Sequence, residues 1–326
     1  RRAGRSLRDA FLRICQGRPL LLPRMIPLGD MEDDDLLIAG WESTDLVADD
    51  SLSLTLAMPR LRRQLLLSRL IMARSDNNAT PGQAMLLAME LAKLLDQIHT
   101  ERCNLSSLAQ LVPDDFAEHW GITLEFLKLL PEVWPKLLAS EHTIDPAVRR
   151  NLLLEARARQ WLETPPTGPV IAAGSTGSIP ATADLLATIA NLPDGRIVLP
   201  GLDREAPDDI WDNLNPQHPQ YGMAKLIRHL GIRRTDVIDW PILSNITAPP
   251  NRALIINAAL APAKSTTQII MEKNAASLAL KGITRIDCPG PSEEAATIAL
   301  IMRHNLQIAG RTIALVTPDR GLARRV

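Results

Sequence analysis

Two glycines and three hydroxyl side chains follow a short apolar run in the segment GSTGS, residues 174–178. Glycines let backbone amides approach a phosphate closely, and a helix that begins after such a loop adds its own free amides. A nucleotide-binding P-loop also needs a lysine after its second glycine, and none follows Gly177. Three interpretations stay open: a structural strand-to-helix turn, a contact with a DNA phosphate or a partner, and a nucleotide site.

Lys264 and Ser265 form a second candidate for phosphate binding, after the apolar run at 254–257. The positions that the P-loop pattern assigns to glycine hold Ala258 and Ala263, whose methyl groups would obstruct the loop. The segment GSTG also lacks the Gly-x-Ser-x-Gly pattern of a hydrolase nucleophile. We therefore expect no complete ATPase or hydrolase motif, which leaves open whether the chain is an enzyme.

Side chains that could hold a metal ion are scattered along the chain. The six histidines form no HExxH pattern, and the three cysteines form no Cys-x-x-Cys pair. Asp33 and Asp35 stand in an acidic stretch that is more typical of a solvated turn than of a hard-cation site. His119 and His218 are more typical of structural hydrogen-bonding residues. We predict no catalytic, cofactor-binding or metal-binding residue in this chain.

Arginine side chains gather at two places, where they could position phosphates. They are Arg60, Arg62, Arg63 and Arg69 on one predicted helix, and Arg320, Arg324 and Arg325 further along the chain. An arginine on a helix surface is more often solvated, so these clusters alone do not indicate DNA binding. The whole chain adds no long-range field, because 36 basic and 37 acidic residues give a net charge of -1.

Length and composition indicate a globular protein. The 326 residues suffice for two domains or one large one, and a hydrophobic fraction of 46% supplies ample core. No run approaches the ~18 apolar residues of a membrane span, and the cysteine usage is typical of a reducing compartment. We predict a soluble cytoplasmic protein with no membrane partner. Because the chain opens inside a helical pattern without methionine, we expect an internal piece of a longer protein.

Two parts of the chain are expected to be helical. Apolar periodicity predicts a basic helix at 4–16, and it predicts further helices at 55–75, 122–130 and 145–163 within a helical region that spans 52–163. Another begins in TPGQAM, with Thr80 as its N-cap and Pro81 as its first helical residue. The core-facing stripe of that helix is predicted to consist of Leu87, Leu91, Leu94 and Ile98.

From residue 168, short apolar runs alternate with helical segments, which is typical of a parallel α/β sheet covered on both faces. The runs lie at 170–173, 197–199, 254–256, 283–286 and 313–316. Between the last two, a crossover helix is predicted with Ser292 as its cap and Gly310 as its stop. The predicted fold class is therefore α/β, with a large helical insertion.

Six segments carry a resemblance to a known family. They are RRAGRSLRDAFLR (1–13), LLPRMIPLGD (21–30), AEHWGITLEFLKLLPEVWPKLL (117–138), PVIAAGSTGSIPATADLLATIANLPDGRIVLPGLD (169–203), HPQYGMAKLIRHLG (218–231) and IALVTPDRGLARRV (313–326). In this order they resemble the AddB family of double-strand-break repair proteins, of the alphaproteobacterial type. The resemblance covers nearly the whole chain.

The resemblance implies a RecA-like core of the superfamily 1 helicase type that has lost its motor activity, with a large all-helical insertion. The implied domains are a remnant of the first RecA-like domain at 1–51, the insertion at 52–165, the return to the first domain at 166–246 and the start of the second RecA-like domain at 247–326.

The resemblance also implies a function. AddB-family proteins pair with an AddA-type subunit in a helicase–nuclease that processes double- and single-stranded DNA ends for homologous recombination in the bacterial cytoplasm. The parent complex uses ATP and Mg, and a nuclease domain beyond residue 326 would hold an iron–sulphur cluster in many members. This chain would be a non-catalytic DNA-binding and scaffolding part without a cofactor of its own. The alternatives are an active ATP-dependent motor fragment and an AddA-interaction module that does not touch DNA.

On this hypothesis the candidate DNA-phosphate contacts are Ser175, Thr176, Ser178, Thr317, Arg320 and Arg324. The first three residues follow the strand predicted at 170–173, and the last three follow the strand predicted at 313–316. We therefore expect both groups at the carboxyl edge of a parallel sheet, where such folds bind ligands. Contacts at this edge would be made mainly to phosphates.

Overall fold

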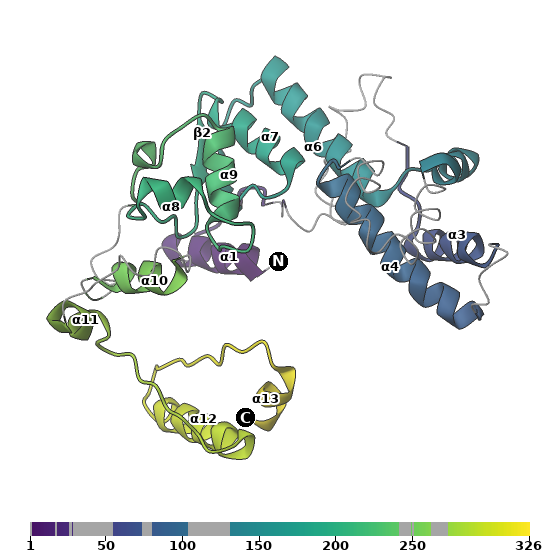
Figure 1. Cartoon of the computed structure of the whole chain (residues 1–326). Helices are drawn as coiled ribbons and strands as arrows, with labels where there is room; N and C mark the ends of the chain where they lie inside the picture. Colours follow the sequence, from purple (N-terminus) through teal and green to yellow (C-terminus); the bar gives the residue numbers. More distant parts are fainter. Residues whose placement is uncertain are drawn as a thin grey trace. The chain divides into compact units, whose positions relative to one another are not determined.

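The computed structural model describes residues 2–16, 18–25, 28, 55–73, 80–103, 131–240, 249, 251–261 and 273–326. The chain divides into two compact units (Figure 1): unit 1 comprises Arg1–Trp240 and Leu260–Ala263, and unit 2 comprises Pro241–Ala259 and Lys264–Val326. The four domains implied by the resemblance stay predictions.

Unit 1 begins with α1 (Arg2–Ile14), which confirms the basic helix predicted at 4–16. The helices predicted at 55–75 and 145–163 are present as α3 (Arg60–Met72) and α6 (Pro146–Glu163). Residues 131–140 are also helical, whereas the helix predicted at 122–130 lies outside the described residues.

The helix α4 (Pro81–Thr100) begins where the sequence predicts it. The Gln83 backbone N donates to Thr80 Oγ1 at 3.4 Å, and the Thr80 backbone N donates to Gln83 Oε1 at 2.9 Å. This reciprocal pair is a capping box, which satisfies two amides that the helix itself leaves without a partner. Local sequence alone therefore fixes the start of α4.

The predicted core stripe of α4 is right only in part. Leu91 and Ile98 are buried as predicted, but Leu87 is 51% exposed. The buried face is completed by Ala84, Ala88, Ala92 and Leu95. These residues pack with Leu66, Leu67, Ile71 and Trp134 in one apolar cluster. Alanines take part because they let α3 lie close to α4, which the pattern of leucines alone does not predict.

A β–α–β unit follows α6. The strands β1 (Val170–Ala173) and β2 (Gly195–Val198) pair in parallel, and α7 (Pro180–Ala190) connects them. The strands predicted at 170–173 and 197–199 are thereby confirmed, although β2 begins two residues earlier than predicted. Ala172 and Ile197 pack with the leucines of α6 and α7 on one face of the sheet.

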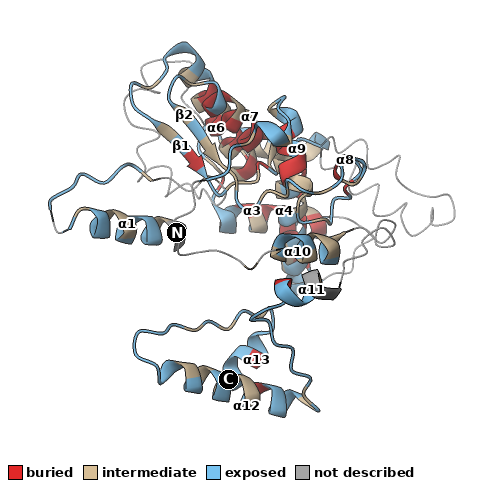
Figure 2. Ribbon diagram, turned by 90° about the vertical axis from the view of Figure 1, so that its left-hand side faces the viewer, coloured by how far each residue is buried: buried red, intermediate tan, exposed pale blue. Residues whose placement is uncertain are grey.

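The long helix α6 is shared by the helical region and the β–α–β unit. Leu153 and Leu154 are fully buried in the cluster that also contains Leu185 and Leu186 of α7. Figure 2 shows this concentration of buried residues on α6 and α7. Nearer the start of α6, Asn151 Nδ2 donates to the His99 carbonyl of α4 at 2.8 Å. The helix α6 therefore contributes to the apolar cluster of the β–α–β unit and is hydrogen-bonded to α4 of the helical region.

Unit 1 ends with the helices α8 (Asp208–Asp212) and α9 (Tyr221–His229) and the short 3-10 helix η4 (Arg234–Asp236). Trp211 and Leu214 pack against Ala224 and Ile227 of α9 in a small apolar cluster. The Arg234 guanidinium lies over the Trp211 ring, 4.5 Å from its centroid. This cation–π contact holds η4 against α8.

After residue 250 the described residues contain α10 (Arg252–Leu260), α11 (Lys273–Ala279), α12 (Pro291–Leu306) and α13 (Arg320–Arg325). The strand predicted at 254–256 is wrong, because these residues lie inside α10. No strand is formed at 283–286 or 313–316 in the described structure. A four-residue apolar run does not distinguish a buried strand from a helix, and a strand also needs a hydrogen-bonded neighbour.

The crossover helix predicted near residue 290 is present as α12, but both of its predicted ends are wrong. Gly290 is the N-cap and Pro291 the first helical residue, so Ser292 lies inside the helix. The helix ends at Leu306, four residues before the predicted stop at Gly310. Pro291 decides the start, because its fixed φ suits the first helical position and it has no amide hydrogen to leave unpaired. Taken over both units, the described chain is mostly helical with one small parallel sheet.

Candidate nucleic-acid interface

The loop at 174–179 joins the carboxyl end of β1 to the amino end of α7. Gly174 and Gly177 adopt φ values of +76° and +59°, which other L-residues rarely adopt. Ser175 Oγ accepts a hydrogen bond from the Gly177 backbone N at 3.2 Å and closes the turn. The turn itself therefore requires both glycines, and one of the three predicted hydroxyls is engaged inside it.

This loop packs against the first turns of α9. A Cβ added to Gly177 would come within 2.7 Å of Leu226 Cδ1. A Cβ added to Gly222 would lie 3.5 Å from Thr176 Oγ1. The close approach of loop and helix thus requires glycine at 177, whereas a Cβ at Gly222 would make an ordinary van der Waals contact. Ser178 remains exposed, whereas Ser175 and Thr176 are half-buried.

Two helix amino ends border the loop. Ile179 is the N-cap residue of α7 and Gln220 that of α9, and neither makes a side-chain capping bond. The amides of a first helical turn carry partial positive charge and point toward an approaching anion. The loop itself carries no charged side chain. In α7, Pro180 has no amide hydrogen and Ala181 and Thr182 are buried, so an anionic oxygen at this loop would be met mainly by the exposed Ser178 hydroxyl.

Gln220 joins the start of α9 to the turn that follows β2. Its Nε2 donates to the Gly201 carbonyl at 2.9 Å, and its Oε1 accepts from the Asp203 backbone N at 3.1 Å. His218 Nδ1 accepts from the Gln220 backbone N at 3.1 Å, which confirms the structural role predicted for this histidine. The segments after both strands thus meet the start of α9 at one edge of the sheet. No sequence pattern singled out Gln220.

The second group of candidates lies at the turn before α13. Thr317 Oγ1 accepts from the Asp319 backbone N at 3.1 Å, and Asp319 Oδ1 accepts from the Gly321 backbone N at 2.7 Å. Asp319 is the N-cap of α13, so its carboxylate already accepts the hydrogen bond of an amide that a phosphate would otherwise bind. A phosphate contact here would depend on arginine side chains instead.

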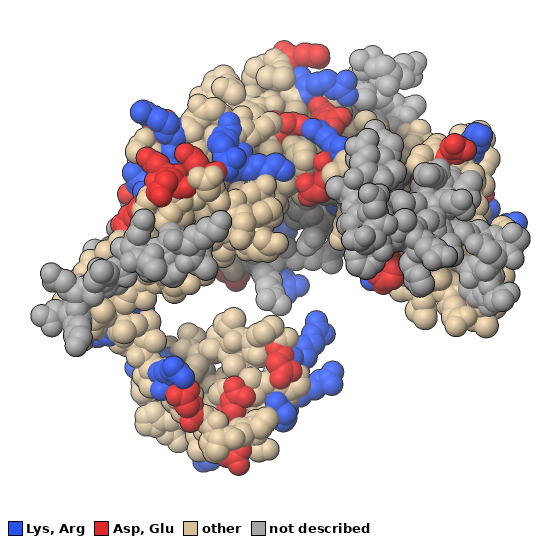
Figure 3. Space-filling view, viewed as in Figure 1, with Lys and Arg blue, Asp and Glu red and all other residues tan. Residues whose placement is uncertain are grey.

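Arg320 and Arg324 are exposed on α13. Between residues 300 and 326 the chain carries Arg303, Arg311, Arg320, Arg324 and Arg325, against the single acidic residue Asp319. Figure 3 shows basic side chains projecting from the part of unit 2 that contains α13. The near-neutral chain therefore has a local excess of positive charge in unit 2.

The six candidates fall into two groups. Ser175, Thr176 and Ser178 share one loop of unit 1, and Thr317, Arg320 and Arg324 share one turn and helix of unit 2. Only the first group lies at the carboxyl end of a strand as expected; for the second group this expectation is wrong, because residues 313–316 do not form a strand.

The basic cluster predicted on α3 is not a four-charge surface. Arg63 is buried, with Nη1 2.7 Å from Asp96 Oδ1 and Nε 2.8 Å from Asp145 Oδ1. Arg62 Nη2 lies 2.6 Å from Glu141 Oε1. The other two arginines of the cluster are exposed. Half of this cluster thus has a structural partner, which weakens the case for a phosphate contact there.

Asp145 is a buried charged residue that no sequence motif indicated. Its carboxylate is 1% exposed, accepts a hydrogen bond from Trp134 Nε1 at 2.9 Å and lies 3.3 Å from His99 Nε2. Burial alone would raise the pKa of this carboxyl. The His99 hydrogen bond, the Arg63 charge and the Trp134 hydrogen bond outweigh burial and hold the pKa below its ordinary value. These four residues come from α3, α4, the helix at 131–140 and the N-cap of α6.

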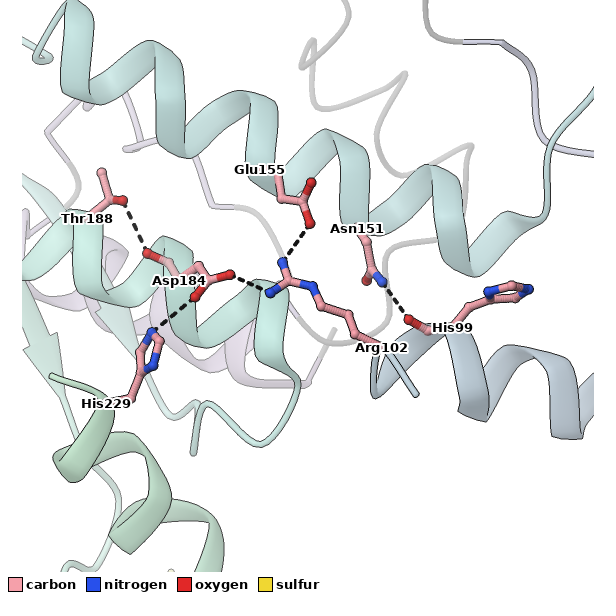
Figure 4. A network of polar contacts seen from close by, with 7 residues as sticks. All are labelled: His99, Arg102, Asn151, Glu155, Asp184, Thr188 and His229. Carbon is pink, nitrogen blue, oxygen red and sulfur yellow. Dashed lines mark hydrogen bonds and ion pairs between the residues drawn. The ribbon is translucent and has the colours of Figure 1, made fainter. Parts of the chain in front are cut away.

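A second polar network joins four helices of unit 1 (Figure 4). Arg102 follows α4, and its Nη2 donates to Glu155 Oε1 of α6 at 2.6 Å while its Nη1 donates to Asp184 Oδ2 of α7 at 2.8 Å. His229 Nε2 of α9 lies 3.0 Å from Asp184 Oδ1. We name Arg102, Glu155, Asp184 and His229 the Arg102 cluster. These four residues are far apart in the sequence, so no sequence motif indicated that they would meet.

Groups of three or more His, Cys, Asp or Glu side chains that could hold a metal ion do not occur among the described residues. The described residues do not include the candidates Asp33, Asp35, His119, Lys264 and Ser265. The apolar run before Lys264 is helical rather than a strand, so this segment lacks the strand-to-loop context of a P-loop. In the same described part of the chain, no helix is long and apolar enough to cross a membrane.

Comparisons of this chain with family models, curated proteins and solved structures find no match.

Proposed function

We propose that this chain is a non-catalytic DNA-binding and scaffolding part of an AddB-type subunit, in a helicase–nuclease that processes DNA double-strand breaks for recombination. The observation that carries the proposal is the loop at 174–179, which stands at the carboxyl edge of a parallel β–α–β unit between two uncapped helix amino ends. Ligands of parallel α/β folds bind at this edge. The resemblance of the six segments to the AddB family indicates that this ligand is a DNA backbone.

The same proposal includes the finer fold. The β1–α7–β2 unit would belong to a RecA-like core of the superfamily 1 type, and the helices from α3 to α6 would form its insertion. The parallel strand pair with its helical crossover and the long helical region that precedes it both support this assignment.

The proposed partners are an AddA-type subunit and DNA ends, in the bacterial cytoplasm. ATP and Mg would act in the parent complex, with any iron–sulphur cluster outside this chain. The scaffolding role is supported by the two structural networks around Asp145 and Arg102, which connect helices of unit 1 to one another.

Charge limits how strongly such a chain can hold DNA. The loop offers hydroxyls and amides but no cation, and the cationic excess of 300–326 is confined to a few arginines. Each neutralised phosphate lowers log affinity by roughly 0.7 to 0.9 per decade of salt. We therefore expect weak, sequence-independent binding with a shallow salt slope.

The test is a salt titration of single- and double-stranded DNA binding, with this chain alone and within the assembled complex. Replacing Arg320 and Arg324 with Ala should lower affinity evenly across DNA sequences and flatten the slope. The matched control is Arg285→Ala, because Arg285 is exposed in the same unit and paired with its neighbour Asp287.

The loop is tested in the same way by Ser178→Asp, which adds a like charge next to the proposed phosphate, with Ser178→Ala as its size control. Weaker binding for the aspartate variant alone would support the loop contact. If all variants keep the affinity and slope of the unmodified chain, DNA binding by these residues is rejected and the AddA-interface alternative is favoured.

A further inference from the structure

We infer that Arg102 is a positioning residue for the loop at 174–179, because it couples the end of α4 to both helices that border this loop. The inference deepens the proposed function and takes its biological meaning from it. Its structural content, however, can be measured without DNA.

The backbone of Arg102 is fixed by the way α4 ends. Arg102 has a φ of +53°, and its backbone N donates to the His99 carbonyl at 3.2 Å. The Cys103 backbone N donates to the Ile98 carbonyl at 2.9 Å. This pair of bonds is a Schellman motif, whose left-handed position is usually glycine. An arginine there is strained, and such strain persists where the surrounding contacts over-determine the conformation.

The side chain of Arg102 supplies those contacts. Its guanidinium forks between Glu155 on α6 and Asp184 on α7, in the planar two-pronged geometry that suits arginine and carboxylates. All three side chains are partly exposed, so each ion pair alone contributes little to stability. Together the two ion pairs define the position of α7 relative to the end of α4.

Asp184 links the Arg102 contact to the loop at 174–179. It lies in the second turn of α7, whose first residue, Pro180, directly follows the loop. Its other carboxylate oxygen faces His229 of α9, the helix whose Gly222 and Leu226 contact the loop. The carboxylate of Asp184 is thus shared between α4, α7 and α9 (Figure 4). Loss of the Arg102 contact should loosen both helices that hold the loop.

The experiment is hydrogen exchange of individual amides by NMR in the whole chain. The reporters are three bonded amides beside the loop: Gly177 N, which donates to Ser175 Oγ, Ala183 N, which donates to the Ile179 carbonyl, and Ala224 N, which donates to the Gln220 carbonyl. Arg102→Gln and Asp184→Asn should each speed their exchange about two- to fivefold, the range that the loss of exposed ion pairs gives. Arg102→Lys should keep part of the protection, since an ammonium retains the charge but lacks the rigid planar fork of the guanidinium.

Two further variants keep the inference falsifiable. Arg102→Gly removes the side chain but suits the left-handed backbone, so faster exchange in this variant cannot come from a disrupted end of α4. Arg196→Gln removes an exposed arginine whose ion pair is with nearby Asp194, and it should leave all three reporters unchanged. Unchanged exchange at the reporters in both Arg102→Gln and Arg102→Gly would overturn the inference. Faster exchange with unchanged DNA affinity would support it and count against the loop as a DNA contact.

Discussion

The Trp134 indole nitrogen donates a 2.9 Å hydrogen bond to the Asp145 carboxylate in the interior of the helical region. Asp145 also lies beside His99 and Arg63, so one buried carboxylate receives a partner from each of three neighbouring helices. Removing this carboxylate leaves the buried Arg63 with its ion pair to Asp96, and the loss of a partner from a buried charge is strongly destabilising. One ionised side chain thus contacts three helices that also pack through a shared apolar cluster.

The first prediction concerns that carboxylate. Asp145→Asn should destabilise the chain by roughly 3 kcal/mol, because Arg63 stays buried and loses the closest charge to its Nε. Asp96→Asn removes the other partner of Arg63, but Asp96 is 44% exposed, so its cost should stay below about 1 kcal/mol. Chemical denaturation of both variants measures the difference, and equal costs would contradict the importance assigned to Asp145.

The second prediction is a pH dependence. The pKa of Asp145 is lower in the folded chain than in the unfolded chain, where a carboxyl titrates near pH ~3.9. Ionised Asp145 therefore stabilises the fold above the unfolded pKa, and this contribution is lost as pH falls through the folded pKa. Unfolding free energies of the unmodified chain and of Asp145→Asn should differ by a constant amount near neutrality and converge in acid. A difference that grows in acid would show that the pKa shift has the opposite sign.

The third prediction compares the two loop glycines. Gly174→Ala should cost roughly 1–2 kcal/mol, because only the positive φ is strained and no atom lies near its Cβ. Gly177→Ala carries the same strain and also collides with the fully buried Leu226, so its cost should be larger by roughly 1–3 kcal/mol. Thermal unfolding measures both. In a Leu226→Ala background the two glycine substitutions should become equal, and a persistent difference would place the collision elsewhere.

A fourth prediction tests the orientation of α4. Leu91 is 7% exposed, so Leu91→Asp buries an unpaired charge and should destabilise by roughly 3 kcal/mol or more. Leu87→Asp, one turn earlier at a side chain that is 51% exposed, is the matched control, and it should change stability by less than about 1 kcal/mol. Denaturation curves that rank these two variants in the opposite order would reject the orientation of the helix.

The last prediction concerns nucleotide. We expect this chain alone to neither bind nor hydrolyse ATP appreciably, because no loop combines glycine at the two P-loop positions with a following lysine. Isothermal calorimetry with Mg and ATP is the measurement. Micromolar affinity that disappears in Lys264→Ala would favour the motor alternative.

Much of the helical architecture follows from local sequence. Thr80 and Pro81 mark the start of α4 because capping and a fixed proline φ act within one turn of the chain. The run at 170–173 is a strand as predicted, because β2 supplies its hydrogen-bonded neighbour. The equally apolar run at 254–256 is helical, because so short a pattern fits both structures.

The candidate site divides in the same way. The sequence alone determined that a glycine-rich turn with hydroxyl side chains follows β1, because positive φ angles and a tight turn are demands of the local backbone. Only the tertiary structure decided that Gly177 faces Leu226, and that Arg102 meets Asp184, 82 positions away in the chain. Contacts of this range depend on how α4, α6, α7 and α9 pack, and no periodicity or motif in the sequence encodes which charged side chains will meet.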